Sequence, residues 1–259
     1  MTGRNPARER LAKGELSLGM GLRQARTVDV AAALATCGYD WLFIDLEHGT
    51  MPLDTAVQIS VAALGAGISP LVRVPSRQYA LATRALDGGA LGIVMPHVDT
   101  AEEARAVVDH LKYPPVGHRS VAGGQAWFGF RAVPMAEATE TMNRETLVTV
   151  MLETPQAIAN ADAIAAVKGV DVLLIGTNDL AMEMGIPGQV GHAEVARAYE
   201  QVIAACRKHG KWPGMGGVYA EDLMAKYIAM GMRMILSGND LGMMMAGATQ
   251  RAKFLRERQ

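Results

Sequence analysis

Short apolar runs alternate with helical patterns along the whole chain, and each run ends at a polar or turn residue. Their near-continuous apolar character is typical of strands that are buried on both faces of a parallel sheet. The eight runs cover residues 16–20, 40–45, 70–74, 91–95, 147–152, 171–175, 212–218 and 232–236. The helical patterns cover residues 27–37, 53–66, 77–87, 100–112, 154–167, 191–209, 220–230 and 238–257.

Eight strand–helix units in series predict a single closed (β/α)8 barrel over residues 1–259. The length of 259 residues agrees with the roughly 250 residues of such a barrel. A doubly wound open sheet is the alternative, but no dinucleotide-binding glycine pattern follows the first run. No linker divides the chain. Residues 1–14, in which Arg and Glu alternate, are expected to form a solvated leader helix.

Charge, hydropathy and cysteine usage exclude several classes of function. The net charge of −1 argues against nucleic-acid binding, which usually requires a basic stripe. The apolar runs are shorter than the roughly 20 residues that span a bilayer, and no signal peptide is visible. Cys37 and Cys206 lie far apart without metal-like spacing, so both are expected to be reduced and buried in a cytoplasmic protein.

Polar side chains follow the predicted strands at their carboxyl ends, where barrel enzymes carry their active sites. Carboxylates that meet at one rim repel one another unless a cation neutralises them. Oxygen ligands on neighbouring strands suit Mg²⁺ or Mn²⁺ better than zinc, because no cysteine joins the set. In chain order the rim residues are Asp45, Glu47, His48, Arg73, His97, Glu153, Thr154, Gly176, Thr177, Asn178, Asp179, Ser237, Asn239 and Asp240.

Histidine and lysine positions narrow the chemistry further. His48 follows Asp45 closely enough for the carboxylate to fix its tautomer and raise its basicity. His97 follows a strand end and is a candidate to position the site residues without contacting the substrate itself. No lysine lies at the carboxyl end of a predicted strand, so an imine-forming aldolase would lack its nucleophile. An enolate formed at this rim would therefore need a metal for stabilisation.

Several stretches resemble the class II pyruvate aldolases, which include 4-hydroxy-2-oxoheptanedioate aldolase, 2-dehydro-3-deoxyglucarate aldolase and macrophomate synthase. The matching stretches are Gly38–His48 (GYDWLFIDLEH), Val72–Pro75 (VRVP), Leu86–Gly89, Gly117–Arg119 (GHR), Leu152–Thr154 (LET) and Ile175–Gly185 (IGTNDLAMEMG). The resemblance implies a barrel of the phosphoenolpyruvate/pyruvate-binding type. It also implies a carbon–carbon lyase that cleaves or forms 4-hydroxy-2-oxo acids from pyruvate or hydroxypyruvate and an aldehyde.

Carried over by position, the resemblance implies Glu153 and Asp179 as ligands of Mg²⁺ or Mn²⁺, with Co²⁺ as a further option. It implies His48, paired with Asp45, as the general acid–base. Arg73 would contact the 2-oxo acid.

The same resemblance has consequences for assembly. Asp87 matches a residue that helps to build the site of a neighbouring subunit in relatives. Members of the family form hexamers, which are dimers of trimers, and exchange their last helix. Residues 238–257 are therefore expected to be swapped between subunits.

The acceptor side of the pocket departs from the family. Relatives often carry Trp just after the first strand, and several carry Gln where this chain has Met151. An apolar pocket wall distinguishes substrates that differ by one methylene group by only about 1–3 kcal/mol. We therefore expect the enzyme to accept a broad range of aldehydes. The residues expected to contact the substrate, beside Arg73, are Gly176, Thr177, Trp127 and Val218, with Met20, Leu22, Arg23, Phe128 and Tyr219 as further candidates.

Two other functions are compatible with parts of this pattern. A malyl- or citramalyl-coenzyme A lyase would require a nucleotide pocket, for which the chain offers no clearly suited basic patch. The other alternative is a non-catalytic barrel that only binds 2-oxo acids or a partner protein. Such a barrel would not require the carboxylates, the imidazole and the guanidinium that this chain has at the rim, which are those of Glu153, Asp179, His48 and Arg73. The irregular stretch 113–134 is long enough to be functional or to contact a partner.

Overall fold

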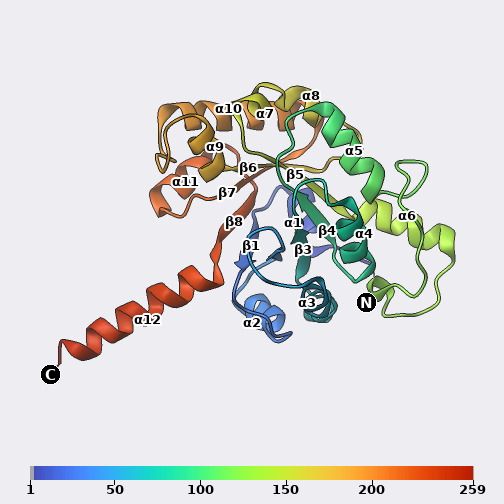
Figure 1. Ribbon diagram of the computed structural model, residues 1–259, viewed down its shortest axis with the longest axis horizontal. Helices are drawn as coiled ribbons and strands as arrows, with labels where there is room; N and C mark the ends of the chain where they lie inside the picture. The colour runs from blue at the N-terminus through green and yellow to red at the C-terminus, as the bar shows by residue number, and fades with distance from the viewer. Residues whose placement is uncertain (1–2, 259) are drawn as a thin grey trace.

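The computed structural model describes residues 3–258, which form a closed barrel of eight parallel strands (Figure 1). Each strand pairs with the next one, and β8 pairs with β1 to close the sheet. The predicted (β/α)8 barrel is therefore confirmed. The strands are β1 (Ser17–Leu22), β2 (Trp41–Asp45), β3 (Ser69–Arg73), β4 (Gly92–Met95), β5 (Leu147–Leu152), β6 (Val172–Gly176), β7 (Trp212–Gly216) and β8 (Met234–Asn239).

Helices surround the barrel, and most begin and end close to the predicted positions. Thr100 caps α5 through a capping box with Glu103. The helices are α1 (Pro6–Ala12), α2 (Val30–Thr36), α3 (Leu53–Ala66), α4 (Tyr79–Asp87), α5 (Ala101–Leu111), the 3-10 helix η1 (Ala126–Phe128), α6 (Met135–Glu145), α7 (Pro155–Ala159), α8 (Ala161–Ala165), α9 (Thr177–Glu183), α10 (Ala193–His209), α11 (Glu221–Met230) and α12 (Asp240–Arg256).

Alternation of side chains along each strand separates two apolar clusters. On β2, Trp41 and Phe43 belong to the cluster that fills the barrel. Leu42 and Ile44 belong to the cluster between the sheet and the helices. Because side chains alternate with a period of two, the next residue, Asp45, follows the inward set. The same alternation aims the last residues of several other strands at the barrel axis.

The N-terminal helix is a plug rather than the solvated leader that the charge pattern predicted. Ala7 and Leu11 of α1 are buried in the interior cluster. The side chain of Asn5 donates hydrogen bonds to the carbonyls of Leu91 and Glu145. Arg8 forms an ion pair with Asp171, 2.8 Å between Nη1 and Oδ1. The prediction was wrong because it considered only the charged residues. Ala7 and Leu11, which are four residues apart, lie on one face of the helix, and this face packs against the barrel.

Three further expectations required correction. The helix predicted over residues 154–167 is divided into α7 and α8 at Asn160. Helix α6 was not predicted at all, and Met142 is its one buried residue. Cys206 is buried as expected, but Cys37 is exposed. Among the described residues, no helix combines the length and apolar character needed to cross a membrane.

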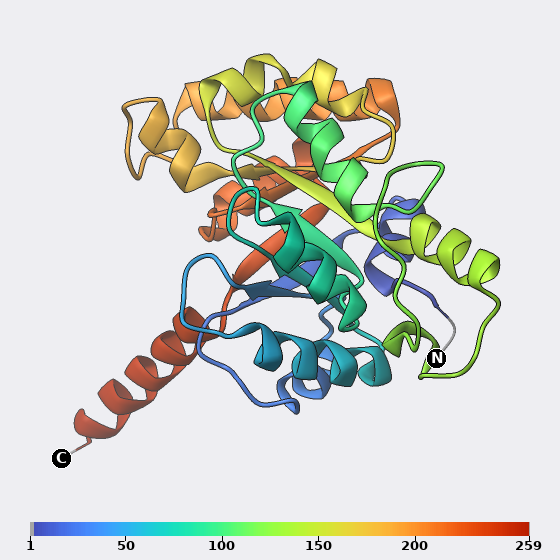
Figure 2. The same ribbon diagram turned by 45° about the vertical axis from the view of Figure 1, so that its right-hand side comes forward.

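Helix α12 leaves the barrel and extends away from it in both views (Figures 1 and 2). None of its residues is buried in the single chain. Met243, Met244 and Met245 are each at least half exposed. A long helix that carries exposed apolar side chains and packs mainly on β1 and β8 of its own barrel suits an intermolecular role.

Candidate active site

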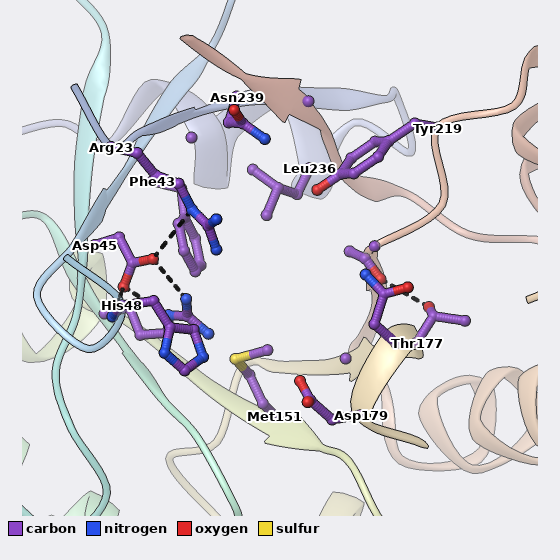
Figure 3. Close-up of a pocket in the computed structure, with 17 residues that line it drawn as sticks. Arg23, Phe43, Asp45, His48, Met151, Thr177, Asp179, Tyr219, Leu236 and Asn239 are labelled. Carbon is purple, nitrogen blue, oxygen red and sulfur yellow. Dashed lines mark hydrogen bonds and ion pairs between the residues drawn. The ribbon is translucent and has the colours of Figure 1, made fainter. Parts of the chain in front are cut away.

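A pocket opens at the carboxyl ends of the strands (Figure 3). Its volume is about 200 Å³, which is below the 300–1,000 Å³ typical of sites for drug-sized ligands. Asp45, Arg73, Gly176, Thr177 and Asp179 all line it. The structure therefore brings together residues from β2, β3, β6 and the start of α9 that the sequence placed at one rim. The pocket suits small substrates.

Asp45 and Arg73 form a buried ion pair at the base of the pocket. Arg73 Nε and Nη2 donate to Oδ1 and Oδ2 of Asp45 at 3.0 and 2.6 Å. This two-pronged geometry is the strongest arrangement between a guanidinium and a carboxylate. Arg73 Nη1 also lies 2.9 Å from Glu47 Oε2. The guanidinium stands over the ring of Phe43, 4.9 Å from its centroid. Arg73 is thus held rigidly with one face toward the pocket.

His48 also lines the pocket, but its expected pairing with Asp45 is not made by the imidazole. The carboxylate of Asp45 accepts hydrogen bonds from the backbone N–H groups of Glu47 and His48, at 3.0 and 3.1 Å. The ring Nε2 of His48 lies 4.0 Å from Glu47 Oε2. Asp45 therefore positions the loop that carries His48, and Glu47 is the carboxylate nearest to the ring. The side chain of His48 is 56% exposed, so it is accessible from solvent.

Glu153 lies behind the pocket surface, and its carboxylate is almost entirely buried. Its Oε2 accepts a hydrogen bond from the backbone N–H of His97 at 2.8 Å, and the Nδ1 of His97 lies 3.3 Å from the same oxygen. His97 adopts a left-handed φ of 53°, which is uncommon outside glycine. The expectation that His97 supports the site from behind agrees with these contacts.

The environment of Glu153 disfavours its charged form. Burial raises the pKa of Glu153 to about 7, against the hydrogen bond from the His97 N–H, while the carboxylates of Asp179 and Glu47 act in the same direction as burial. Carboxylates whose pKa is raised in this way are common at functional sites. Among residues 3–258, no three His, Cys, Asp or Glu side chains surround a common metal position.

Gly176 and Thr177 serve the pocket in different ways. A Cβ at Gly176 would lie 2.6 Å from Cγ and Oε1 of Glu153. Only glycine leaves room for that carboxylate at the end of β6. The hydroxyl of Thr177 donates to the carbonyl of Gly216 at 2.7 Å and contacts the hydroxyl of Tyr199 at the same distance. Thr177 therefore lines the pocket, while its hydroxyl connects the start of α9 to β7 and α10.

Residues 23–246 match the HpcH/HpaI aldolase/citrate lyase family. The chain belongs to this family. It is 40% identical over 250 residues, 95% of this chain and 93% of the relative, to 4-hydroxy-4-methyl-2-oxoglutarate aldolase tasA of Hapsidospora irregularis. It is 45% identical over 210 residues, 80% of this chain and 78% of the relative, to 4-hydroxy-4-methyl-2-oxoglutarate aldolase cghB of Chaetomium globosum.

A solved structure of the family supports the same assignment. The HpcH/HpaI aldolase of Desulfitobacterium hafniense superimposes with a TM-score of 0.92, at 31% sequence identity, over 96% of each chain. The resemblance to pyruvate aldolases noted in the sequence is therefore confirmed, and the protein is an enzyme of the HpcH/HpaI family. Because the match extends over nearly the whole chain, it includes every rim residue described above.

Two expected pocket residues lie elsewhere in this HpcH/HpaI barrel. Trp127 is buried, and its indole N–H donates to the carbonyl of Ala90 at 3.0 Å, next to the amino end of β4. It closes the opposite end of the barrel, so its assignment to the substrate pocket was wrong. Val218 is buried in the cluster between sheet and helices, whereas its neighbour Tyr219 lines the pocket. The direction of a loop side chain was not visible in the sequence.

The residues at the end of β1 and directly after it are divided between the pocket lining and the core. Met20 and Leu22 are buried and do not line the pocket, whereas Gly21 and Arg23 do. Asp87 ends α4 and forms an ion pair with Arg119, 2.6 Å between Oδ1 and Nη2. It does not line the pocket of its own chain.

Glu47 and Asn239 received no individual role from the sequence, although both stood in the rim set. The signal that could have singled out Glu47 is its place between Asp45 and His48.

Proposed function

We propose that the protein is a divalent-metal-dependent aldolase that cleaves or forms 4-hydroxy-2-oxo acids. The donor would be pyruvate or hydroxypyruvate, and the acceptor a small carbonyl compound. The observation that carries the proposal is that Asp179 and the Arg73–Asp45 pair line one pocket of an aldolase-family barrel, with the buried carboxylate of Glu153 close enough to Asp179 to interact with it electrostatically. The names of the two relatives described above, both aldolases of a 4-hydroxy-2-oxo acid, support it.

The donor set fits a hard divalent cation. Glu153 and Asp179 follow adjacent strands, β5 and β6, and offer only carboxylate oxygens. Mg²⁺ and Mn²⁺ prefer such ligands and retain water or substrate at their other positions. Co²⁺ is a third candidate. The raised pKa of Glu153 supports this assignment because a cation would restore its charge. When bound, such an ion supplies positive charge at the keto oxygen of the 2-oxo acid.

The chain's own residues supply binding and proton transfer. Arg73 can donate charge-assisted hydrogen bonds to the oxygens of the 2-oxo acid, and its bonds to Asp45 and Glu47 fix its direction. In cleavage, His48 accepts the proton of the 4-hydroxyl while the bond between C3 and C4 breaks. The acceptor leaves as a carbonyl compound. C3 of the enolate then takes up a proton to give the 2-oxo acid, and synthesis reverses these steps.

Metal-dependent exchange of the methyl protons of pyruvate tests this proposal. Wild-type protein should exchange these protons with Mg²⁺ or Mn²⁺ and stop when a chelator is added. Glu153→Ala and Asp179→Ala should abolish exchange and tight metal binding without unfolding the protein. Asp162→Ala is the matched control, because this exposed aspartate pairs with Lys208 far from the pocket. Exchange that persists in chelator-treated protein would remove the basis for the metal assignment.

The same assay separates the two alternatives. A barrel that only binds 2-oxo acids would show no exchange under any condition. A coenzyme A thioester lyase would prefer acetyl thioesters to pyruvate as the carbon donor. The small volume of the pocket favours neither a nucleotide nor a bulky thioester within it.

We also propose a homo-oligomer, specifically a hexamer arranged as a dimer of trimers, in the cytoplasm. The exposed methionines of α12 support exchange of this helix between subunits. The position of Asp87 at the amino-end side of its own barrel supports a role in a neighbouring site rather than its own. The partners are then small molecules and further copies of this chain. Neither nucleic acid nor a membrane is needed.

A further inference from the structure

Arg23 brings a second guanidinium to the pocket, apart from the one that the aldolase mechanism uses. It lines the pocket, and its side chain is 45% exposed. Its Nε lies 3.8 Å from Asp45 Oδ2, which is too far for a hydrogen bond. In the part of the chain that the structure describes, no acceptor is hydrogen-bonded to its guanidinium. Its terminal N–H groups are therefore available to a ligand.

Asp45 forms only a long ion pair with Arg23. That carboxylate already accepts two bonds from Arg73 and two from backbone N–H groups. Its oxygens are occupied by donors closer than Arg23. In Figure 3 the guanidinium of Arg23 points into the pocket from the β1 side, across from the hydroxyl of Tyr219. A positive group therefore faces the part of the pocket that lies between Arg23 and Tyr219.

The backbone next to Arg23 is fixed in place by Asp240. Its carboxylate accepts hydrogen bonds from the N–H groups of Arg23, Gln24 and Ala25, at 3.0, 2.8 and 2.6 Å. Partial burial alone would raise the pKa of Asp240, but these backbone bonds hold it below its usual value. The loop therefore does not need to be ordered when a ligand arrives, which reduces the entropic cost of binding.

Asn239 adds a neutral donor beside this loop. Its Oδ1 accepts a hydrogen bond from the N–H of Gly242 at 2.9 Å, which fixes the orientation of the amide. The amide nitrogen then faces the pocket, as Figure 3 shows. Tyr219 contributes a hydroxyl from the opposite wall. One charged and two neutral donors thus line this part of the pocket, whereas Asp179 of the proposed metal site lies across the pocket from Asn239, as Figure 3 shows.

We propose that Arg23, Asn239 and Tyr219 form a subsite for a carboxylate on the acceptor. This inference rests on the proposed aldolase function and specifies its substrate class. The acceptor would be a 2-oxo acid or an aldehyde acid rather than a simple aldehyde. The molecule that is cleaved would carry two carboxylates, one bound near Arg73 and the other at Arg23. The bond between C3 and C4 breaks as before, and the released oxo acid retains its charge.

A pair of acceptors of similar size but different charge tests the subsite. Glyoxylate carries a carboxylate next to its aldehyde, and glycolaldehyde carries a neutral hydroxymethyl group there. With pyruvate as donor, kcat/KM for glyoxylate should exceed that for glycolaldehyde in the wild type. Arg23→Met should lower this ratio about 10- to 100-fold, the usual effect of losing hydrogen bonds to a charged group. Arg23→Lys should retain part of the ratio.

Arg26→Met is the matched control, because Arg26 belongs to the same loop and bonds to Thr50 instead of facing the pocket. It removes the same charge nearby and should leave the ratio unchanged. The subsite is disproved if Arg23→Met lowers both acceptors equally, if Arg26→Met has the same effect, or if the change appears in the KM for pyruvate.

Proton exchange into pyruvate without an acceptor separates this inference from the proposed function. If the wild type exchanges but its acceptor ratio does not depend on Arg23, the subsite alone is wrong. If it shows neither exchange nor aldol addition, both are wrong.

Discussion

Substitution of Gly176 by alanine should disable the site without a large effect on the fold. The new Cβ would lie 2.6 Å from Oε1 and Cγ of Glu153, whereas ordinary contact begins near 3.4 Å. The carboxylate would have to move by about 0.8 Å. It cannot do so freely, because the N–H of His97 holds its other oxygen at 2.8 Å. Gly176→Ala therefore displaces the buried carboxylate that is proposed to bind the metal.

The expected magnitude follows from the displacement. Disturbing the support of a metal ligand typically costs 10- to 100-fold in affinity, and a misplacement near 1 Å can cost about 10²-fold in rate. We expect Mn²⁺ affinity to fall about 10- to 100-fold and kcat to fall about 10²-fold. Overpacking should cost about 1–3 kcal/mol of stability. Titration calorimetry with Mn²⁺, aldol cleavage rates and thermal unfolding measure these three effects.

Gly216→Ala provides the control on the neighbouring strand. Gly216 is the register partner of Gly176 and lines the same pocket. Its added Cβ would meet Leu236 Cδ2 at 3.4 Å, an ordinary contact. The change at Gly216 should therefore affect metal affinity much less than the change at Gly176. If Gly176→Ala binds Mn²⁺ as tightly as the wild type and keeps its kcat, the argument from the carboxylate position is refuted.

Three other measurements address the acid–base, the buried carboxylate and the assembly. His48→Ala should lower kcat about 10²–10⁴-fold at unchanged Mn²⁺ affinity, and loss of metal with the imidazole would make it a ligand instead. Without metal, the free energy of unfolding should fall by roughly 3 kcal/mol between pH 4.5 and 7, because folded Glu153 retains a proton that the unfolded chain releases. Urea titrations should show this slope in the wild type and not in Glu153→Gln. Light scattering should give a hexamer that deletion of residues 240–259 breaks up; a fully active wild-type monomer would contradict the proposed exchange.

The barrel was predictable because its strands are short, apolar and buried on both faces. No solvent-facing alternation interrupts runs such as Trp41–Ile44, and the period of two then determines that Asp45 follows the inward set. Helix α6 was missed for the opposite reason. It is largely exposed, with Met142 as its buried residue, and so has little apolar pattern to detect. Burial generates the signal that sequence analysis reads.

The sequence predicted which residues lie at the candidate site, but not which of their side chains contact one another. The sequence placed Asp45, Arg73 and Asp179 at one rim because the carboxyl ends of parallel strands meet there. It could not show that Asp45 binds Arg73 rather than the ring of His48, because that choice depends on side-chain direction within a few ångströms. Trp127 failed for a similar reason, since a long loop can return to either end of a barrel.

Helix α1 has a consequence for the order in which the chain acquires its structure during synthesis. Several of its partners are made much later in translation: Asn5 donates to the carbonyl of Glu145, and Arg8 pairs with Asp171 and lies over the ring of Trp212. At about 5–20 residues per second, most of the chain must be translated before these contacts can form. Until the later strands have been made, α1 therefore lacks these contacts, and its apolar face is open to chaperones during that interval.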